Sequence, residues 1–534
     1  MPGGALRDRL FAIDGRSLAA FRISIGTLVV ADLLARAGAL VQHYTDAGVL
    51  PRAALDRLFL LSDWHWSVHL WTGSTAGQAV LFAVAAAAAG ALIVGYRTRL
   101  ATVVTWVLLV SLQARNPMVS YGADQLVRLE LFWAMFLPLG ATWSLDRRRA
   151  RRAGGTRADG DPGRQLSMAS AALLLQPCVM YVFSGLLKQN PAWWSGDAIA
   201  YALSAETYAT RFGRELLGHP ALLESLSHAV PWIELLAPAA LFVPWATPWL
   251  RTGALLLLVA FHLGIAAVLT TGLFQPVALA ALLPFVPRAA WDRLSTTVGR
   301  GGAPVAAPRG ARSRRAEAPP RPLRGRWYAT ALQGLVAALF VYALAWNVAG
   351  LRIEEYTVRQ SLAWYREWWA AGRAGVPLTF RDYGVERMLG PVGWIGRVAG
   401  LHQRWDMFHR VGAEIRGWPL IVGTLGDGRR ISVLEGGRPF AGAAHPRPDD
   451  ALAFYPGTRW LVYFTYLRTP GTRPARELLP PVVARDWTWR HPERRLEALA
   501  ILFARESPSA AGGTAPEPDV WYEGPVPGAV AGPR

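Results

Sequence analysis

Apolar segments long enough to cross a bilayer recur along the chain and constrain its fold more than any other feature. A spanning helix needs about 20 apolar residues to cross roughly 30 Å of hydrocarbon. Nine segments approach or reach this length: residues 18–40, 75–96, 99–114, 125–143, 167–187, 229–247, 252–271, 273–287 and 327–350. We therefore predict a polytopic α-helical membrane protein with about nine transmembrane helices, embedded in the lipid bilayer.

The arginines predict an orientation. They concentrate in the segments that would share a side with the N-terminus, above all residues 147–164 and 288–326. Because basic loops stay in the cytoplasm, we expect a multi-pass cell-membrane protein with a cytoplasmic N-terminus and an extracytoplasmic C-terminus. The net charge of +19 then reflects topology and not nucleic acid binding.

Composition divides the chain into regions. Residues 1–290 are predicted to form the main transmembrane domain, and residues 327–350 the last transmembrane helix. Between them, residues 291–326 are rich in Gly, Pro, Ala and Arg, which predicts a basic, disordered cytoplasmic linker. Residues 351–506 are predicted to form a Trp-rich extracytoplasmic α+β region, followed by a flexible tail over 507–534.

Two segments of the α+β region have local signals. Two apolar runs around Asp427-Gly428 predict a β-hairpin over residues 418–434. Residues 459–466 are predicted to be either a strand or the start of a buried helix. Residues 354–373 alternate charged and aromatic residues, as an amphipathic helix does.

Lys188 is the only lysine of the sequence, whereas every other basic residue among the 56 lysines and arginines is an arginine. It follows an apolar run and precedes Pro191 and Trp193. A guanidinium is always charged, but a desolvated amine can lose its proton and act as a base. A lysine that anchors the helix at the membrane interface is the alternative. Because arginine would serve equally well as an anchor, we favour a catalytic Lys188.

Other ionisable groups lie within the apolar segments. Asp32 and Arg36, four residues apart, can neutralise each other, and together with Arg22 we expect them to clamp helices structurally. Packing and function are equally open for a second set, which should converge on itself or on a wet cavity because burying an unpaired charge is costly. This second set comprises Asp124, Arg128, Glu234 and His262.

Metal and disulfide chemistry is not predicted. His65 and His69 have the i, i+4 spacing of metal ligands on a helix, but three nearby tryptophans favour an interfacial amphipathic helix. Cys178 is the only cysteine, which excludes an intrachain disulfide. No phosphate-binding loop, dinucleotide-binding turn or nucleophile elbow occurs.

Several motifs together resemble the HTTM (horizontally transferred transmembrane) domain family, bacterial relatives of vitamin K-dependent γ-carboxylase. The resemblance covers roughly residues 10–290. It rests on Arg22…Asp32…Arg36, Arg115-Asn116-Pro117, Gly122-Ala-Asp124…Arg128, Pro138…Asp146, Tyr181-x-Phe-x-Gly-x-x-Lys188-x-x-x-x-Trp193-x-x-Gly196, Glu234, Phe261-His262 and Gly272-x-Phe274. Residues 403–408 are similar to a segment that often follows this domain.

The resemblance implies a mechanism in which Lys188 deprotonates a reduced quinone of vitamin K or menaquinol type. O2 then adds, an epoxide forms, and the strong base produced lets a glutamate capture CO2. The supporting residues would be His262, Glu234, Asp124, Arg128 and Asn116, with Trp193 and Gly196 structural. The chain has Asn116-Pro117 where the carboxylase has Asn-His, and it lacks an evident propeptide-binding region. Quinol epoxidation is therefore better supported than peptide carboxylation.

Two other functions fit the sequence. The protein could be a non-catalytic membrane component for the maturation, export or immunity of a secreted peptide or protein. The C-terminal region would then bind the partner, and Lys188 would be an anchor. A transporter is a third alternative, since buried charge pairs also line transport pathways, but no inverted repeat is visible.

Overall fold

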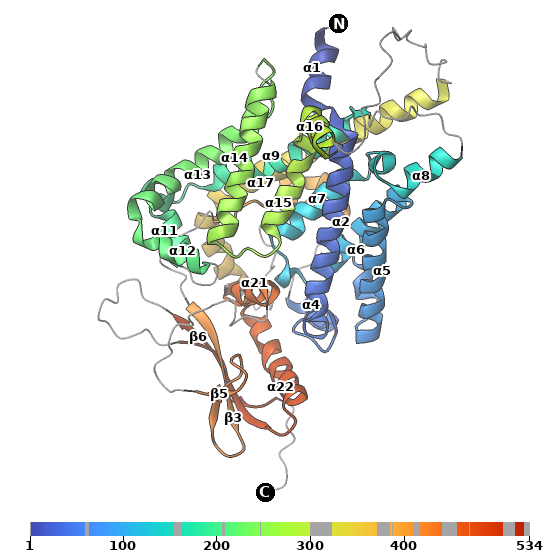
Figure 1. Cartoon of the computed structure of the whole chain (residues 1–534). Coiled ribbons are helices and arrows are strands. Elements are labelled where there is room, and N and C mark those ends of the chain that lie inside the picture. The colour runs from blue at the N-terminus through green and yellow to red at the C-terminus, as the bar shows by residue number, and fades with distance from the viewer. Residues whose placement is uncertain are drawn as a thin grey trace.

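The computed structural model describes residues 2–527 apart from 59–63, 154–162, 205–208, 246, 299–322, 371–384, 387, 409–416, 441–456, 469 and 506–517. The described residues form a helical body with a small sheet at one end (Figure 1). The sheet lies at the end of the helix bundle opposite helix α1 (Pro2–Phe11).

The helices of the body are α2 (Gly15–Ala37), α3 (Leu40–Tyr44), α4 (Arg52–Leu58), α5 (Thr75–Val94), α6 (Thr98–Arg115), α7 (Gly122–Ala134), α8 (Leu145–Arg152), α9 (Met168–Leu187), α10 (Pro191–Trp194), α11 (Ala198–Ser204), α12 (Arg211–Glu215), α13 (Pro220–Ala240), α14 (Thr247–Val268), α15 (Phe274–Leu282), α16 (Arg288–Val298) and α17 (Leu323–Ala370). Short 3-10 turns connect several of them, at Val68–Leu70, Pro117–Val119, Leu139–Ala141, Leu216–Gly218 and Leu283–Phe285. A two-residue strand β1 (Ile13–Asp14) pairs with β2 (Arg164–Gln165).

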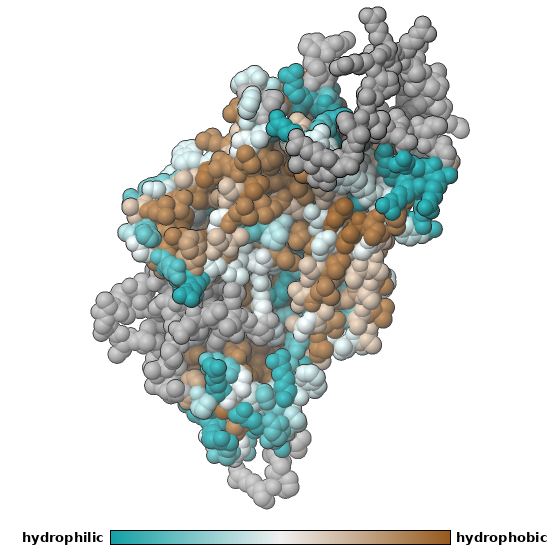
Figure 2. Space-filling model, in the orientation of Figure 1, coloured by the Kyte–Doolittle hydropathy of each residue, from teal (hydrophilic) through white to brown (hydrophobic). Residues whose placement is uncertain are grey.

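The described part of the chain holds five helices that are long and apolar enough to cross a membrane: Gly15–Ala37, Thr75–Val94, Met168–Leu187, Trp249–Val268 and Trp327–Leu351. Hydrophobic surface covers this bundle, and hydrophilic surface covers the sheet end (Figure 2). The protein is therefore a multi-pass membrane protein embedded in lipid.

The other four predicted spans correspond to α6, α7, α13 and α15. Helix α7 has 13 residues and is only about 20 Å long, short of the roughly 30 Å of hydrocarbon. Nine spans and the orientation of the termini stay predictions.

Helix packing places α9 at the centre of the body. It contacts α7, α13, α15 and α17, while α2 packs along α5 and α15. Small residues permit the close approaches: a Cβ on Gly26 of α2 would lie 2.8 Å from Ile93 Cγ1 of α5. The buried side chains of these helices and of the C-terminal region form one continuous hydrophobic cluster.

The C-terminal sheet has five antiparallel strands in the order β5-β4-β3-β6-β7. These are β3 (Gly417–Leu425), β4 (Arg430–Ser432), β5 (Arg438–Pro439), β6 (Leu496–Arg505) and β7 (Asp519–Pro525), with helices α19 (Trp394–Val398), α21 (Thr458–Leu467) and α22 (Leu479–Arg490) and 3-10 turns at Gly390–Val392 and Pro470–Leu478. The predicted hairpin is confirmed, with Val422 opposite Ser432 and Gly428 at φ 80° in the turn. Residues 459–466 adopt the helical alternative.

Two predicted regions differ from the structure. The predicted tail 507–534 is not wholly flexible, because it contains strand β7. Trp521 of this strand stacks on Phe503 of β6, with the ring centres 5.4 Å apart. The first residues of the predicted linker 291–326 belong to α16, where Trp291 Nε1 donates to Ser17 Oγ at 2.8 Å. Residues 299–322 of that linker lie outside the described residues, and residues 354–370 continue helix α17.

Candidate functional site

Lys188 follows the last turn of α9, and the residue is 2% exposed. Ser167 caps the start of the helix, and its hydroxyl accepts a hydrogen bond from Ser170 N. At the other end the Lys188 side chain turns back over the helix, so that Nζ lies 2.8 Å from Ser184 Oγ and 3.4 Å from Ser184 O. Residues four apart share a helix face, so local geometry alone brings these groups together.

Glu234 of α13 supplies the counter-charge to Lys188. The distance between Lys188 Nζ and Glu234 Oε2 is 2.6 Å, and the Ser184 hydroxyl donates to Glu234 Oε1 at 3.1 Å. Ser184 therefore accepts from the amine and donates to the carboxylate. The three side chains form a closed, buried hydrogen-bonded group.

Gly185 allows α9 and α13 to approach closely enough for this pair. A Cβ at Gly185 would lie 3.0 Å from Leu235 Cγ and 3.2 Å from Pro231 O. Both distances are too short for an ordinary carbon contact. A larger residue would force the two helices apart and with them the amine and the carboxylate.

Trp193 also lies next to the amine. Its ring centre lies 5.3 Å from Lys188 Nζ, within the range of a cation–π contact. Its indole Nε1 donates to Phe408 O at 3.0 Å, which fixes the ring. Gly196, at φ 88°, ends this turn where a Cβ would meet Glu224 Cγ at 2.5 Å. Trp193 and Gly196 thus hold the segment after Lys188 in place.

Tyr181 connects the same face of α9 to His262 of α14. Tyr181 Oη lies 2.6 Å from His262 Nε2, and His262 Nδ1 is hydrogen-bonded to Gln275 Oε1. Because an amide oxygen only accepts, Nδ1 carries the proton and Nε2 accepts from the tyrosine. Tyr181, Ser184 and Lys188 are spaced i, i+3 and i+7, which places them on one face. That spacing is a signal by which the sequence could have revealed Tyr181 as a site residue.

A family model described as the HTTM domain matches residues 11–291. The chain belongs to the HTTM domain family. The matched residues include Lys188, Glu234 and His262, and the protein is thus a membrane protein of the carboxylase-related family. No curated protein and no solved structure matches the chain.

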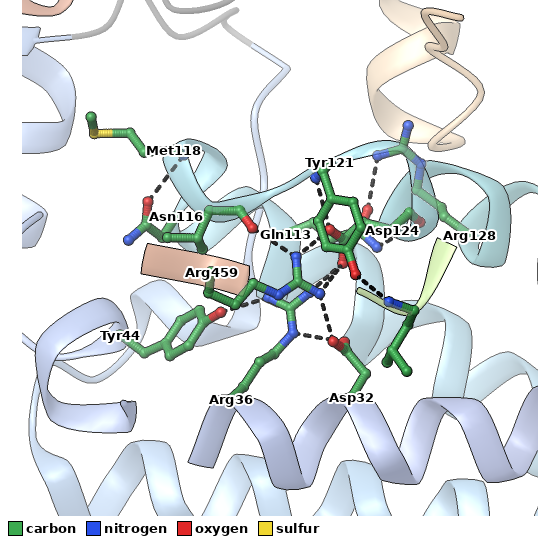
Figure 3. Close-up of polar contacts among 12 residues, drawn as sticks. Asp32, Arg36, Tyr44, Gln113, Asn116, Met118, Tyr121, Asp124, Arg128 and Arg459 are labelled. Carbon is green, nitrogen blue, oxygen red and sulfur yellow. Dashed lines mark hydrogen bonds and ion pairs between the residues drawn. The ribbon is translucent and has the colours of Figure 1, made fainter. Parts of the chain in front are cut away.

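A second buried charge cluster lies within the HTTM domain (Figure 3). Arg36 Nε donates to Asp32 Oδ2 at 2.7 Å, and its Nη2 donates to Asp124 Oδ1. Arg36 Nη1 donates to Tyr44 Oη at 2.5 Å. The predicted Asp32–Arg36 pair is therefore present, and it joins α2 to α7.

Arg459 of α21, which lies outside the HTTM domain, completes the charge cluster. Its Nη2 donates to Asp32 Oδ1 at 2.5 Å and to Asp124 Oδ1 at 2.9 Å. Burial alone would lower the pKa of Arg459, but Asp124 and Asp32 raise it well above its ordinary value. Two carboxylates and two guanidiniums thus balance. Arg459 was not among the predicted site residues, although an arginine at the head of an apolar run is a signal for a buried partner.

Asp124 and Arg128, four residues apart on α7, do not contact each other. Asp124 is in the first turn, and its Oδ2 accepts from Tyr121 N at 2.9 Å, which turns the carboxylate toward the helix start. Arg128 donates instead to Gln113 Oε1 at 3.0 Å and to His402 O at 2.5 Å.

The first alternative for Asp124, Arg128, Glu234 and His262, convergence on one another, is therefore wrong, whereas the second, a wet cavity, stays a prediction. Glu234 binds Lys188, His262 binds Tyr181, and the other two stabilise different parts of α7.

Asn116 and Arg22 have structural contacts. Asn116 Oδ1 accepts from Met118 N at 3.1 Å, and its Nδ2 donates to His43 O at 2.9 Å. Arg22 is fully buried and donates to Leu139 O at 3.2 Å and to Trp143 O at 2.6 Å. It therefore caps the turn after α7, consistent with the predicted structural role.

The His65–His69 pair does not lie on a helix. Residues 65–67 are extended or irregular, and only Val68–Leu70 form a 3-10 turn. His69 Nδ1 lies 2.7 Å from Gln78 Oε1. Within the described residues, no three His, Cys, Asp or Glu side chains are grouped as metal ligands.

Proposed function

We propose that Lys188 and Glu234 form a proton-transfer pair that removes a proton from the hydroxyl of a reduced membrane quinone, of vitamin K or menaquinol type. The observation that carries this proposal is the burial of the only lysine of the chain against one carboxylate and one hydroxyl. The family membership supports the same substrate class.

The contacts of the Lys188 amine match the donors of an ammonium. An ammonium has three N–H donors, and Lys188 Nζ has three acceptors: Ser184 Oγ, Ser184 O and Glu234 Oε2. Transfer of one proton to Glu234 Oε2 leaves a neutral amine and a neutral acid. The net charge of the buried site does not change, so this transfer avoids the cost of an isolated buried charge. The neutral amine is then the base.

The surroundings favour a lipid-soluble substrate. Leu186 and Trp194 lie close to Lys188 in the sequence and are 38% and 50% exposed, so the surface next to this part of the chain is apolar. A substrate hydroxyl reaches Nζ by replacing one of its present partners, for which Ser184 is the nearest neutral group. A reduced quinone supplies an acidic hydroxyl and the electrons that reduce O2. CO2 would be needed only if a glutamate side chain is a second substrate.

The test uses the purified protein in lipid nanodiscs with reduced menaquinone and O2, and mass spectrometry detects quinone epoxide. We expect epoxide from the wild type and none from Lys188→Arg, because arginine keeps the charge but cannot act as a base. Two results would contradict the proposal. One is a Lys188→Arg variant that keeps full function in cells, and the other is a wild-type protein that forms no epoxide.

That contradicting result would favour the non-catalytic alternative, in which the C-terminal region binds a secreted peptide or protein. Deleting residues 354–534 does not separate the two functions, because it removes Arg459 and leaves the buried carboxylates of the HTTM domain unbalanced. Substitutions in the exposed hairpin turn at Asp427 avoid this problem.

A further inference from the structure

A cavity of about 630 Å³ lies between the start of α6, the turn after α7 and helix α8. It is separate from the Lys188 group and shares no lining residue with it. Its wall combines two kinds of surface. Leu137, Pro138 and Leu139 contribute apolar side chains, whereas Arg99, Arg147 and Arg151 contribute guanidiniums.

The floor of the cavity is held by several polar contacts and is therefore preformed. Arg22 holds the carbonyl groups of the turn at Leu139 and Trp143. Asp146 accepts from Arg97 N at 2.8 Å, from Thr98 N at 2.7 Å and from Thr98 Oγ1 at 2.6 Å. These three hydrogen bonds fix the carboxylate of Asp146 in the cavity wall.

The cavity opens where the hydrocarbon-facing surface meets the basic end of the bundle. On α6, next to Arg99, the side chains of Leu100 and Val103 are 56% and 36% exposed. The exposed Trp143 packs edge-on against Trp291 with the ring centres 5.5 Å apart, and tryptophans are enriched at the membrane interface. Hydrophilic surface over α8 adjoins hydrophobic surface of the bundle (Figure 2).

We propose that this cavity binds one anionic phospholipid, with the headgroup phosphate at Arg99 and Arg151 and an acyl chain along Leu137 and Pro138. Guanidiniums match phosphate oxygens in charge and geometry. A free phosphate or a soluble phosphorylated metabolite would leave the apolar half of the cavity in contact with water. A zwitterionic lipid would bring a fourth cation to a site that already has three arginines. Basic residues near a membrane surface attract anionic lipids without binding any one molecule. The cavity differs because it offers a defined binding site for a single lipid.

The test measures lipid retention by native mass spectrometry of the full-length protein. Phosphatidylglycerol and phosphatidylcholine with identical acyl chains are titrated in parallel. We expect retention of one phosphatidylglycerol, and a loss of about tenfold in its affinity in the double variant Arg99→Gln, Arg151→Gln. Arg147 is left in place because its Nη1 also holds Ala141 O at 2.7 Å.

The matched control removes the same number of positive charges from α8 residues that do not line the cavity. Arg148→Gln with Arg152→Gln also deletes two arginines, but neither residue lines the cavity. Its affinity should equal that of the wild type. An equal loss in both double variants would overturn the proposal in favour of diffuse attraction to α8, as would equal retention of phosphatidylcholine.

A cavity-filling variant tests the same site without removing any arginine, so that a loss of lipid is not explained by misfolding of the double variant. Ala150 is exposed and lines the cavity, so Ala150→Trp keeps every charge and blocks the space; it should also lose the lipid. Competition by glycerol 3-phosphate alone, without acyl chains, would overturn the lipid assignment and identify a soluble phosphate site.

Discussion

Lys188 Nζ lies 2.6 Å from Glu234 Oε2, and the two residues are 2% and 6% exposed. A buried ion pair of this kind makes each partner depend on the other. Removing one charge leaves the other without compensation, whereas removing both can be nearly neutral for stability. The stability of single and double variants therefore separates the structural role of the pair from its chemistry.

Glu234→Gln should lower the free energy of unfolding by about 3–5 kcal/mol, because it leaves the Lys188 ammonium unpaired. The double variant Lys188→Met, Glu234→Leu should recover most of this loss and still form no epoxide. Thermal unfolding in detergent, followed by tryptophan fluorescence, measures both. If the double variant is no more stable than Glu234→Gln, the pair does not behave as coupled charges.

Gly185→Val should separate α9 from α13 and cost about 1–3 kcal/mol, as expected for overpacking. Epoxide formation should fall further than stability, because the amine and the carboxylate move apart. Gly264→Ala is the control, since no atom lies within 4 Å of a Cβ built there. Equal effects of the two substitutions would show that the close approach at Gly185 is unimportant.

Arg459→Met should destabilise the protein by about 3–5 kcal/mol, because Asp32 and Asp124 then share one arginine. Limited proteolysis should cut earlier in the C-terminal region, since α21 loses its attachment to the HTTM domain. Arg438→Met, at an exposed position on β5, should leave both measurements unchanged. Wild-type protease resistance in Arg459→Met would refute the role of the charge cluster in docking.

Acid should destabilise the protein through its buried histidines. Burial lowers the pKa of His43 to about 3, with added repulsion from Arg459 and Arg36, and burial lowers that of His69 to about 4. Below an unfolded-state pKa of about 6.5 the unfolded chain binds more protons than the folded one. The contribution of these two histidines to the free energy of unfolding should thus be constant above about pH 7. Below about pH 6 it should fall by about 1.4 kcal/mol per pH unit for each histidine.

His43→Phe tests this pH dependence. Neither ring nitrogen of His43 has a hydrogen-bond partner, and the ring packs 4.5 Å from Trp460, so phenylalanine can keep the contact. The variant should unfold with a shallower dependence on pH between about pH 4 and 6. An unchanged slope would mean that His43 already titrates normally in the folded protein.

Local sequence signals predicted much of the structure. The Asp427-Gly428 hairpin, the helix that ends at Lys188 and the Asp32–Arg36 pair depend on residues close in sequence, where spacing determines geometry. Asp124 and Arg128 are also four residues apart, but the carboxylate of Asp124 binds Arg36, Arg459 and the backbone N–H of Tyr121 instead.

Contacts between residues far apart in the sequence could be raised as possibilities but not decided. Glu234 and Lys188 were both candidates, but their contact depends on Gly185, whose role is visible only once α13 is packed against α9. Arg459 lies 335 residues from Asp124, and no periodicity relates the two. Helix length was also misleading: α7 is apolar, but its 13 residues are mostly buried among other helices.

The charge cluster implies an order of synthesis. Asp32, Arg36 and Asp124 leave the ribosome early, with two carboxylates for one guanidinium, whereas Arg459 follows 427 residues after Asp32. Until then the newly inserted helices carry an excess negative charge inside the nascent membrane body. Translation of nearly the whole polypeptide must therefore finish before the transmembrane domain reaches electrical neutrality at this point, and premature termination upstream of codon 459 should yield a product for membrane quality control to degrade.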